Sequence, residues 1–293
     1  MVVKRLFLHP TFDCSFDKVC REDCYLLAGK SDEEKKFRLP DKYWTQVVHN
    51  AGKAGFKELS LPINPLRGVT GVKDPLYWLR ILAPVAKEYD MVVNITTTLD
   101  VAQKIEKTDI VDIVAISIDD YRTGKDWDKY AEKVKTTSKR LRSFGIEFNC
   151  NLSYNAGTQI AFLFNTMTRR KFLIETFDYT TALWPKPLVK AEILTQMAGK
   201  LIIKGQRNGS SYNDLIGVSD GFLEDYCMSF ARGNSSCDAG YGQLSLDAFG
   251  RLAICPYSPH TVDVSTPEKF QDYLDNTLPK NKVIDSCSLI ELE

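Results

Sequence analysis

Eight cysteines carry most of the chemistry that this 293-residue sequence offers. Three of them, Cys14, Cys20 and Cys24, lie close together directly after the first apolar run of the chain. Three thiolates can hold a [4Fe–4S] cluster by three of its irons, which leaves the fourth iron open to another ligand. A zinc site and a chance grouping of thiols are the two alternatives for this stretch.

A second group of cysteines lies in the last quarter of the chain. Its members are Cys227, Cys237, Cys255 and Cys287. Four thiolates either close a [4Fe–4S] cluster completely or bind Zn²⁺ tetrahedrally. The sequence therefore predicts two metal centres, of which only the first has an open position. The remaining cysteine, Cys150, is most simply a small buried apolar residue of a strand.

The balance of charges excludes some classes of partner. Lys plus Arg and Asp plus Glu both number 38, and a net charge of zero is not expected of a protein that binds nucleic acid through bulk electrostatics. The first apolar run is too short for a signal peptide, and no stretch reaches the roughly 18 apolar residues of a membrane span. We therefore expect a cytoplasmic protein with no membrane or nucleic-acid partner, in which clustered thiols are metal ligands or catalytic groups rather than disulfides.

Short apolar runs rich in Val, Ile and Phe alternate with longer segments of helical character, a pattern typical of buried parallel strands joined by helices. The predicted strands are 3–8, 56–61, 91–96, 113–118, 146–152 and 177–183. The predicted helices are 41–54, 75–88, 99–106, 127–143 and 160–176. Six strand–helix units are two short of a complete eightfold barrel, so we predict an α/β fold, a partial (β/α)6 TIM-like barrel.

Catalytic groups of such barrels gather at the carboxyl ends of the strands, where the three-cysteine loop is expected to lie. After Gly199 the sequence becomes rich in Gly, Ser and Asn, and it then predicts a hairpin with strands at 243–246 and 251–254. We therefore predict a barrel over 1–205. A small extension over 206–293 would contain the hairpin and the second cysteine group.

These motifs together resemble the radical S-adenosylmethionine (radical SAM) enzymes. "CSFDKVCREDC" is similar to their three-cysteine loop, with longer intervals than usual, and "DIVAISIDDYR" resembles their fourth strand, whose Ser-x-Asp is matched by Ser117 and Asp119. "CDAGYGQLSLDAFGRLAICPYSP" resembles the start of a Twitch or SPASM-type C-terminal extension. The Gly-Gly-Glu that often ends the second strand is absent from "ELSLPINPLRG", where Asn64 is a candidate substitute.

The resemblance implies that S-adenosylmethionine binds the open iron of a cluster on Cys14, Cys20 and Cys24. The further cofactor-binding residues would be Asn64, Ser117 and Asp119. Reductive cleavage would give a 5′-deoxyadenosyl radical that abstracts hydrogen from a peptide or a small metabolite. The resemblance assigns no catalytic side chain, and it leaves open whether the reaction is that of an oxidoreductase or a transferase.

The resemblance also implies partners and a rival function. A reductant such as ferredoxin or flavodoxin would supply the electron, and a second [4Fe–4S] cluster on the four C-terminal cysteines would relay electrons. The alternative is a non-catalytic protein that binds an iron–sulfur cluster or zinc and transfers electrons on the same barrel. Formation of 5′-deoxyadenosine discriminates between the two.

Overall fold

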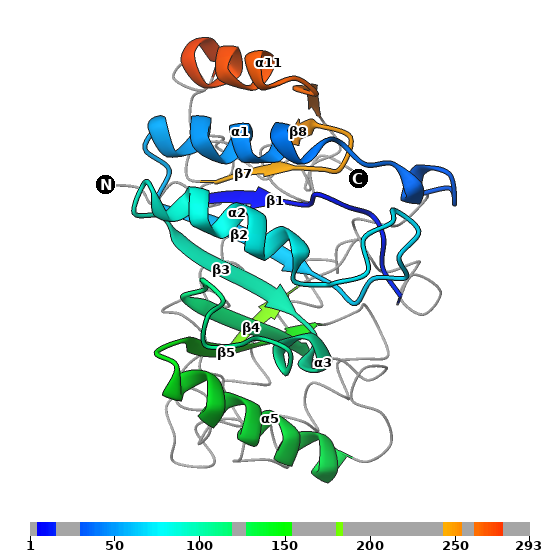
Figure 1. Ribbon diagram of the computed structural model, residues 1–293, viewed down its shortest axis with the longest axis vertical. Coiled ribbons are helices and arrows are strands. Elements are labelled where there is room, and N and C mark those ends of the chain that lie inside the picture. The colour runs from blue at the N-terminus through cyan, green and yellow to red at the C-terminus, as the bar shows by residue number, and fades with distance from the viewer. Residues whose placement is uncertain are drawn as a thin grey trace, which may run out of the picture.

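The computed structural model describes residues 5–15, 30–118, 127–153, 180–183, 243–253 and 261–277. Within these ranges the strands are β1 (Arg5–Leu8), β2 (Glu58–Ile63), β3 (Val92–Thr97), β4 (Ile113–Ile118), β5 (Glu147–Ser153), β6 (Thr180–Leu183), β7 (Gln243–Leu246), β8 (Arg251–Ala253) and β9 (Val262–Asp263). They form one sheet in the order β6-β5-β4-β3-β2-β1-β7-β8-β9 (Figure 1). Every neighbouring pair from β6 to β7 is parallel, whereas β7–β8 and β8–β9 are antiparallel.

The helices are α1 (Asp41–Lys53), α2 (Tyr77–Lys87), α3 (Leu99–Ala102), α5 (Trp127–Ser143) and α11 (Pro267–Asp272), with short turns η1 (Glu34–Lys36) and η2 (Tyr273–Thr277). The ends of β2 to β5 fall within two residues of the predicted ones, and α5 spans the predicted range. The helix predicted over 160–176 lies outside the described residues. The predicted α/β class with a mostly parallel sheet is confirmed, and closure into a partial barrel stays a prediction.

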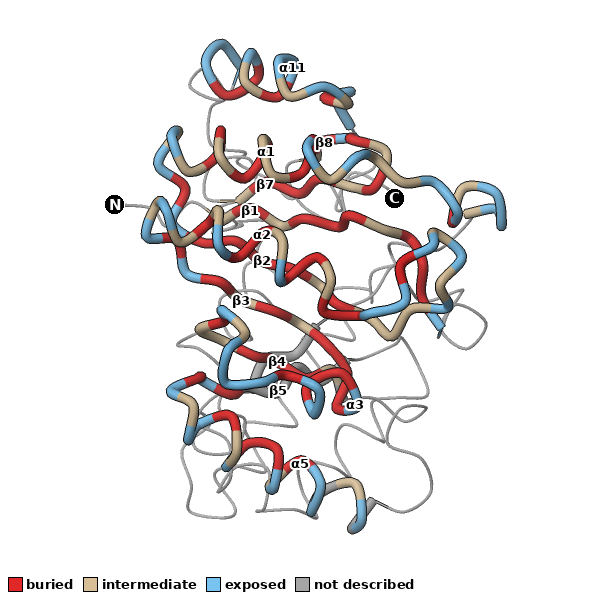
Figure 2. Tube along the Cα trace, in the orientation of Figure 1, coloured by how far each residue is buried: buried red, intermediate tan, exposed pale blue. Residues whose placement is uncertain are grey.

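Helices α1, α2, α3 and α5 lie on one face of the sheet, and the core lies between them and the strands (Figures 1 and 2). Buried residues recur every three or four positions along α1, which is the helical period that places them on one side. Trp44 of α1 meets Trp78 of α2 edge to face at 6.2 Å between ring centroids. Alternate strand residues such as Leu59 and Leu61 fill the other side of this core.

The opposite face of the sheet carries polar groups at the amino ends of the first three strands. Glu58 and Asn94 alternate with core residues of β2 and β3, so their side chains leave on this face. The Glu58 carboxylate lies 2.8 Å from Nε of Arg5 and accepts a 2.9 Å hydrogen bond from Nδ2 of Asn94. Side-chain contacts thus connect β1, β2 and β3 in addition to the backbone pairing of these strands.

The predicted hairpin is confirmed as β7 and β8, and the structure adds its location beside β1. Leu6 pairs with Leu244 and Leu8 with Leu246, so the hairpin extends the same sheet that β1 to β6 form. The turn needs Gly250, which has a φ of +76° and whose added Cβ would lie 2.6 Å from Cα of Ser265. The boundary predicted near residue 205 lies outside the described residues and stays a prediction.

Candidate functional site

The one predicted cluster ligand that the structure describes lies at the carboxyl end of β1. Cys14 follows the strand by six residues and is 4% exposed. It packs with Phe12 and with Ala248 from the turn between β7 and β8. The site thus brings together two segments more than 230 residues apart in the sequence. The remaining predicted metal ligands lie outside the described residues: Cys20, Cys24, Cys227, Cys237, Cys255 and Cys287.

The residue before Cys14 binds the loop that follows β2. The Asp13 carboxylate is buried, and it accepts hydrogen bonds from the backbone N–H groups of Arg67 at 3.0 Å, Gly68 at 2.9 Å and Val69 at 2.9 Å. The three amides converge because Gly68 has a φ of +85°, a backbone conformation that residues other than glycine rarely adopt. This contact joins positions 54 to 56 residues apart, and no local pattern in the sequence predicts it.

An aromatic group connects the Cys14 loop to the hairpin turn. The rings of Phe12 and Phe37 each lie 5.0 Å from the ring of Phe249, which stands at the turn. The ammonium of Lys30 lies 5.2 Å from the Phe12 ring and 5.3 Å from that of Phe249, and the Arg251 guanidinium lies 4.5 Å above the latter. Tilted ring pairs and cations near ring faces contribute packing and attraction, so they hold the turn against the loop.

The structure gathers further polar residues at the same end of the sheet. Asn64 follows β2 directly, and Ser117 is the penultimate residue of β4; both are half-buried. Asp119 lies outside the described residues. Between them, at the end of β3, the Thr97 hydroxyl donates to the carbonyl of Ile63 at 2.5 Å. The sequence could have predicted a polar residue at the end of β3, because the threonine run "TTT" follows an apolar strand there.

Thr98 and His9 complete this set of residues at the carboxyl ends. Thr98 is buried, and its hydroxyl oxygen has no hydrogen-bond partner among the residues that the structure describes. His9 follows β1 directly, and its backbone N–H donates to the carbonyl of Leu246 at 2.9 Å. Burial lowers the pKa of His9 to about 3, because a charged imidazolium would lose its hydration there. The imidazole is therefore neutral at physiological pH.

No group of three His, Cys, Asp or Glu within the described ranges could hold a metal ion. Only Cys14, of the seven predicted metal ligands, falls in those ranges. Its buried thiol beside apolar residues is the kind of donor that iron–sulfur clusters and zinc use. The chemistry of this one donor therefore fits the predicted centre.

A groove of about 810 Å³ lies elsewhere, between α1 and α11. Its lining residues are Leu39, Pro40, Lys42, Tyr43, Gln46, Asn50, Ser265, Thr266, Pro267, Glu268 and Gln271. The Tyr43 hydroxyl donates to the carbonyl of Val264 at 2.7 Å, and Nδ2 of Asn50 donates to that of Pro267 at 3.3 Å. These contacts attach α11 to the outer side of α1. The groove holds none of the predicted site residues.

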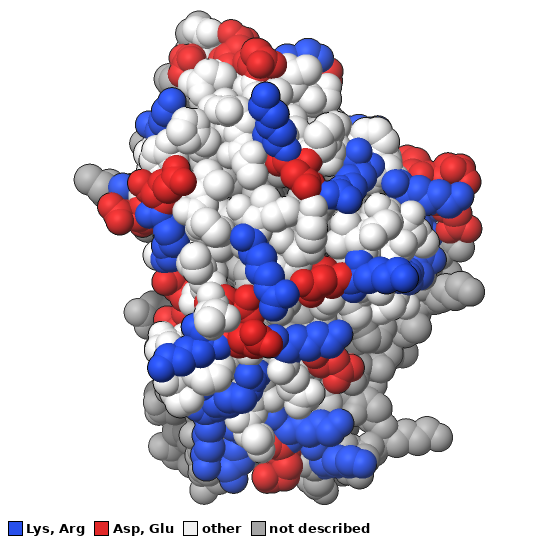
Figure 3. Space-filling model, viewed as in Figure 1, with Lys and Arg blue, Asp and Glu red and all other residues white. Residues whose placement is uncertain are grey.

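The surface carries charges of both signs. Figure 3 shows acidic and basic side chains interspersed over the face in view, with basic ones gathered over α5. None of the helices in the described part of the chain combines the length and the apolar character that a membrane span requires.

The chain is similar in structure to several solved structures of anSMEcpe. No protein-family model and no curated protein matches the sequence. A solved structure described as native anSMEcpe with bound AdoMet is similar, with a TM-score of 0.59 at 12% identity, covering 95% of this chain and 80% of that one. A histidine-tagged form of anSMEcpe with bound AdoMet gives 0.57 at 11% identity, covering 96% and 78%.

Native anSMEcpe with bound AdoMet and the Cp18Cys peptide gives a TM-score of 0.56 at 12% identity, covering 95% of this chain and 80% of that one. At such low identity the similarity shows a shared fold. This chain has the fold of anSMEcpe.

Proposed function

We propose that this protein is a radical SAM enzyme, which cleaves S-adenosylmethionine reductively and uses the resulting radical to abstract hydrogen from a substrate. The observation that carries the proposal is the buried thiol of Cys14 at the carboxyl end of β1, in a chain that shares its fold with anSMEcpe bound to AdoMet. The carboxyl ends of parallel strands are where such sheets place their ligands.

Cys14, Cys20 and Cys24 would hold a [4Fe–4S] cluster through their thiolates. When bound, such a cluster supplies the electron that splits the cofactor into methionine and a 5′-deoxyadenosyl radical. Phe12 and Ala248 pack with Cys14 and shield its thiol from water. Exclusion of water protects a reactive radical from side reactions.

Asn64, Ser117 and Asp119 are the proposed contacts to the rest of the cofactor. The amide of Asn64 and the hydroxyl of Ser117 both donate and accept hydrogen bonds, which suits the hydroxyl and carboxylate groups of S-adenosylmethionine. Thr98 adds a buried hydroxyl at the end of β3, the strand between β2 and β4. Three neighbouring strands would thus each offer one polar side chain to one ligand.

The finer architecture belongs to the same proposal. It comprises a partial (β/α)6 barrel over 1–205 and a Twitch or SPASM-like extension over 206–293. The four C-terminal cysteines would hold a second [4Fe–4S] cluster that relays electrons from a reductant such as ferredoxin or flavodoxin. The hairpin supports a functional link between the two parts, because Ala248 at its turn packs with Cys14 and Phe249 packs against Phe12.

The substrate is proposed to be a peptide, with a small metabolite as the alternative. The basis for this preference is that one of the similar structures is anSMEcpe with both AdoMet and the Cp18Cys peptide. Binding of that peptide is a property of anSMEcpe, and its extension to this chain rests on the shared fold.

A non-catalytic iron–sulfur or zinc protein that transfers electrons is the second candidate. Two features of the sequence favour it. "ELSLPINPLRG" contains no Gly-Gly-Glu, and the intervals between the cysteines of "CSFDKVCREDC" are longer than usual.

The test is anaerobic reconstitution with iron and sulfide, followed by addition of dithionite and S-adenosylmethionine. The proposal expects 5′-deoxyadenosine and methionine from the wild type and neither from Cys14→Ala. A protein that carries a full complement of clusters and yet forms no 5′-deoxyadenosine would have the second function instead. Zinc at the C-terminal cysteines after reconstitution would exclude the electron-relay role.

A further inference from the structure

The strongest unexplained feature near Cys14 is the buried carboxylate directly before it. Asp13 is 1% exposed and is surrounded by donors from the loop after β2. Its Oδ1 accepts from the N–H of Arg67, and its Oδ2 accepts from those of Gly68 and Val69. The Arg67 guanidinium Nε lies 3.7 Å from Oδ1 as well. Hydrogen bonds to a charged acceptor are stronger than those between neutral groups, so the carboxylate binds the loop after β2 strongly.

Consecutive backbone amides that converge around a residue with positive φ form a concavity that binds anions. In this chain the anion is the carboxylate of Asp13. The concavity depends on Gly68, because its φ of +85° turns the neighbouring N–H groups to the same side. The loop after β2 is therefore shaped around a residue of the Cys14 loop.

The residue after Cys14 makes a second connection to the same loop. The backbone N–H of Ser15 donates to the carbonyl of Pro65 at 2.8 Å. Cys14 is thus flanked on both sides by residues bonded to the segment 65–69, which directly follows Asn64. A displacement of that segment would displace the thiol, and the reverse also holds.

We propose that Asp13 is a positioning residue, whose carboxylate holds the thiol of Cys14 and the loop after β2 in one fixed arrangement that S-adenosylmethionine then occupies. The inference rests on the proposed function. It adds that the loop from Asn64 to Val69 contributes to cofactor binding. It also adds that Asp13, which does not itself contact the cofactor, fixes the position of this loop.

The test compares Asp13→Asn with a matched control, Asp109→Asn. Asp109 likewise has a buried carboxylate, with a side chain 5% exposed, and it accepts hydrogen bonds from the Glu106 backbone N–H and from Nε of Arg80, both at 2.8 Å. It lies in the connection from α3 to β4. Both variants lose one buried acceptor, so a general loss of stability affects both.

The first measurement is amide hydrogen exchange of the protein without cluster or cofactor. In Asp13→Asn, the amides of Arg67, Gly68 and Val69 should exchange about tenfold faster or more, since a buried donor loses a charged acceptor. The same amides should be unchanged in Asp109→Asn. Equal exchange in Asp13→Asn and wild type would overturn the proposal, whatever the protein's activity.

The second measurement uses the reconstituted protein and separates positioning from folding. Asp13→Asn should bind iron as Asp109→Asn does, while its KM for S-adenosylmethionine rises about tenfold and the cofactor-induced change in the spectrum of the reduced cluster weakens. An identical KM and spectrum in the two variants would overturn the proposal. A wild-type protein that cleaves no S-adenosylmethionine would instead defeat the proposed function and leave the exchange result standing.

A third variant keeps the test decisive if Asp13→Asn does not fold. Gly68→Ala leaves the carboxylate intact but disfavours the positive φ that makes the amides converge, and its Cβ would lie 3.2 Å from Cγ of Lys73. It should raise the exchange rates of the same amides and the KM in the same direction as Asp13→Asn. Wild-type values for both would overturn the proposal.

Discussion

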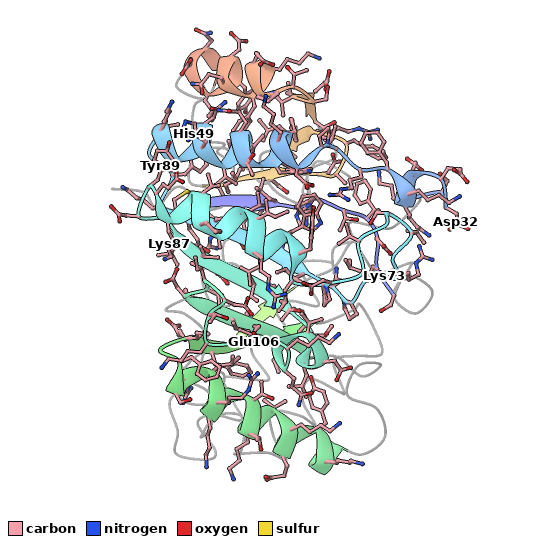
Figure 4. The ribbon with its side chains drawn as sticks, viewed as in Figure 1. Asp32, His49, Lys73, Lys87, Tyr89 and Glu106 are labelled. Atoms are coloured by element: carbon pink, nitrogen blue, oxygen red, sulfur yellow. The ribbon has the colours of Figure 1, made fainter. Side chains whose placement is uncertain are left out.

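The two ends of the central sheet use their polar side chains in different ways. Figure 4 shows His49, Lys87 and Tyr89 together at one end of the strands, and Asp32 and Lys73 at the opposite end. At the amino end, the Tyr89 hydroxyl lies 2.5 Å from Nδ1 of His49, and Lys87 pairs with Asp112, whose carboxylate also accepts from the backbone N–H of Val93.

Beside Cys14, at the carboxyl end, side chains bond to backbone groups instead. Asp13 binds three consecutive amides, and the Thr97 hydroxyl donates to the carbonyl of Ile63. Contacts of the first kind stabilise the fold without shaping a cavity. Contacts of the second kind fix irregular backbone in place, which is what a ligand site built from loops requires. The comparison predicts that variants at the amino end change stability alone, whereas variants at the carboxyl end change cofactor chemistry.

The largest expected effect is at Cys14. Wild-type protein reconstituted anaerobically should bind about eight irons per chain, as two [4Fe–4S] clusters require. Cys14→Ala should lose about half of this iron and all formation of 5′-deoxyadenosine, because a cube on three thiolates needs each of them. Iron analysis and product chromatography measure the two quantities. Unchanged iron content in the variant would show that Cys14 ligates no cluster.

A large effect on stability alone is expected at the amino end from Gly52→Ala. An added Cβ would lie 2.3 Å from Cγ of Tyr89, so the ring must move and break its contact with His49. Overpacking costs typically 1–3 kcal/mol, which exceeds the gain of about 1 kcal/mol that alanine brings to a helix. Chemical unfolding should therefore show a net loss, while the iron content of folded protein is unchanged. A variant more stable than wild type would mean that Tyr89 moves at little cost.

The buried imidazole of His9, just after β1, predicts that the stability of the protein falls in acid. Its folded pKa of about 3 lies below the unfolded value of about 6.5, so the unfolded chain binds the proton first as the pH falls. Stability is lost progressively below pH 6.5, by up to about 1.4 kcal/mol per pH unit. Unfolding at pH 6.5 and pH 5 should show this loss in wild type and a smaller one in His9→Gln. Parallel losses in the two proteins would contradict the buried neutral imidazole.

The smallest effect is expected for Glu58→Gln, at the amino end. The substitution removes the charge that pairs with Arg5 but keeps an acceptor for Asn94. Because Arg5 is 41% exposed, the loss should be no more than about 1 kcal/mol. The KM for S-adenosylmethionine should equal that of wild type. A raised KM would break the distinction between the two ends of the sheet.

Local sequence patterns predicted the elements better than they predicted the contacts between them. Strands β1 to β6, the hairpin and α5 were foreseen, because the spacing of apolar residues and the turn residues act over a few neighbours. Helix α11 was missed although its signal was present, since Thr266 caps it and Pro267 occupies its first turn. The clusters of cysteines predicted a metal site, and Cys14 lies at the end of the sheet where that prediction requires it.

The sequence by itself determined where β1 to β6, the hairpin and α5 lie, and that a thiol follows the first strand. Only the tertiary structure decided that β7 pairs with β1 and that Ala248 packs beside Cys14. It also decided that Asp13 binds the amides of residues 67–69. The physical reason is that the spacing of apolar residues, which marks helices and strands, depends on neighbours along the chain. The partner of a strand edge or of a buried carboxylate instead depends on the sum of contacts between distant segments.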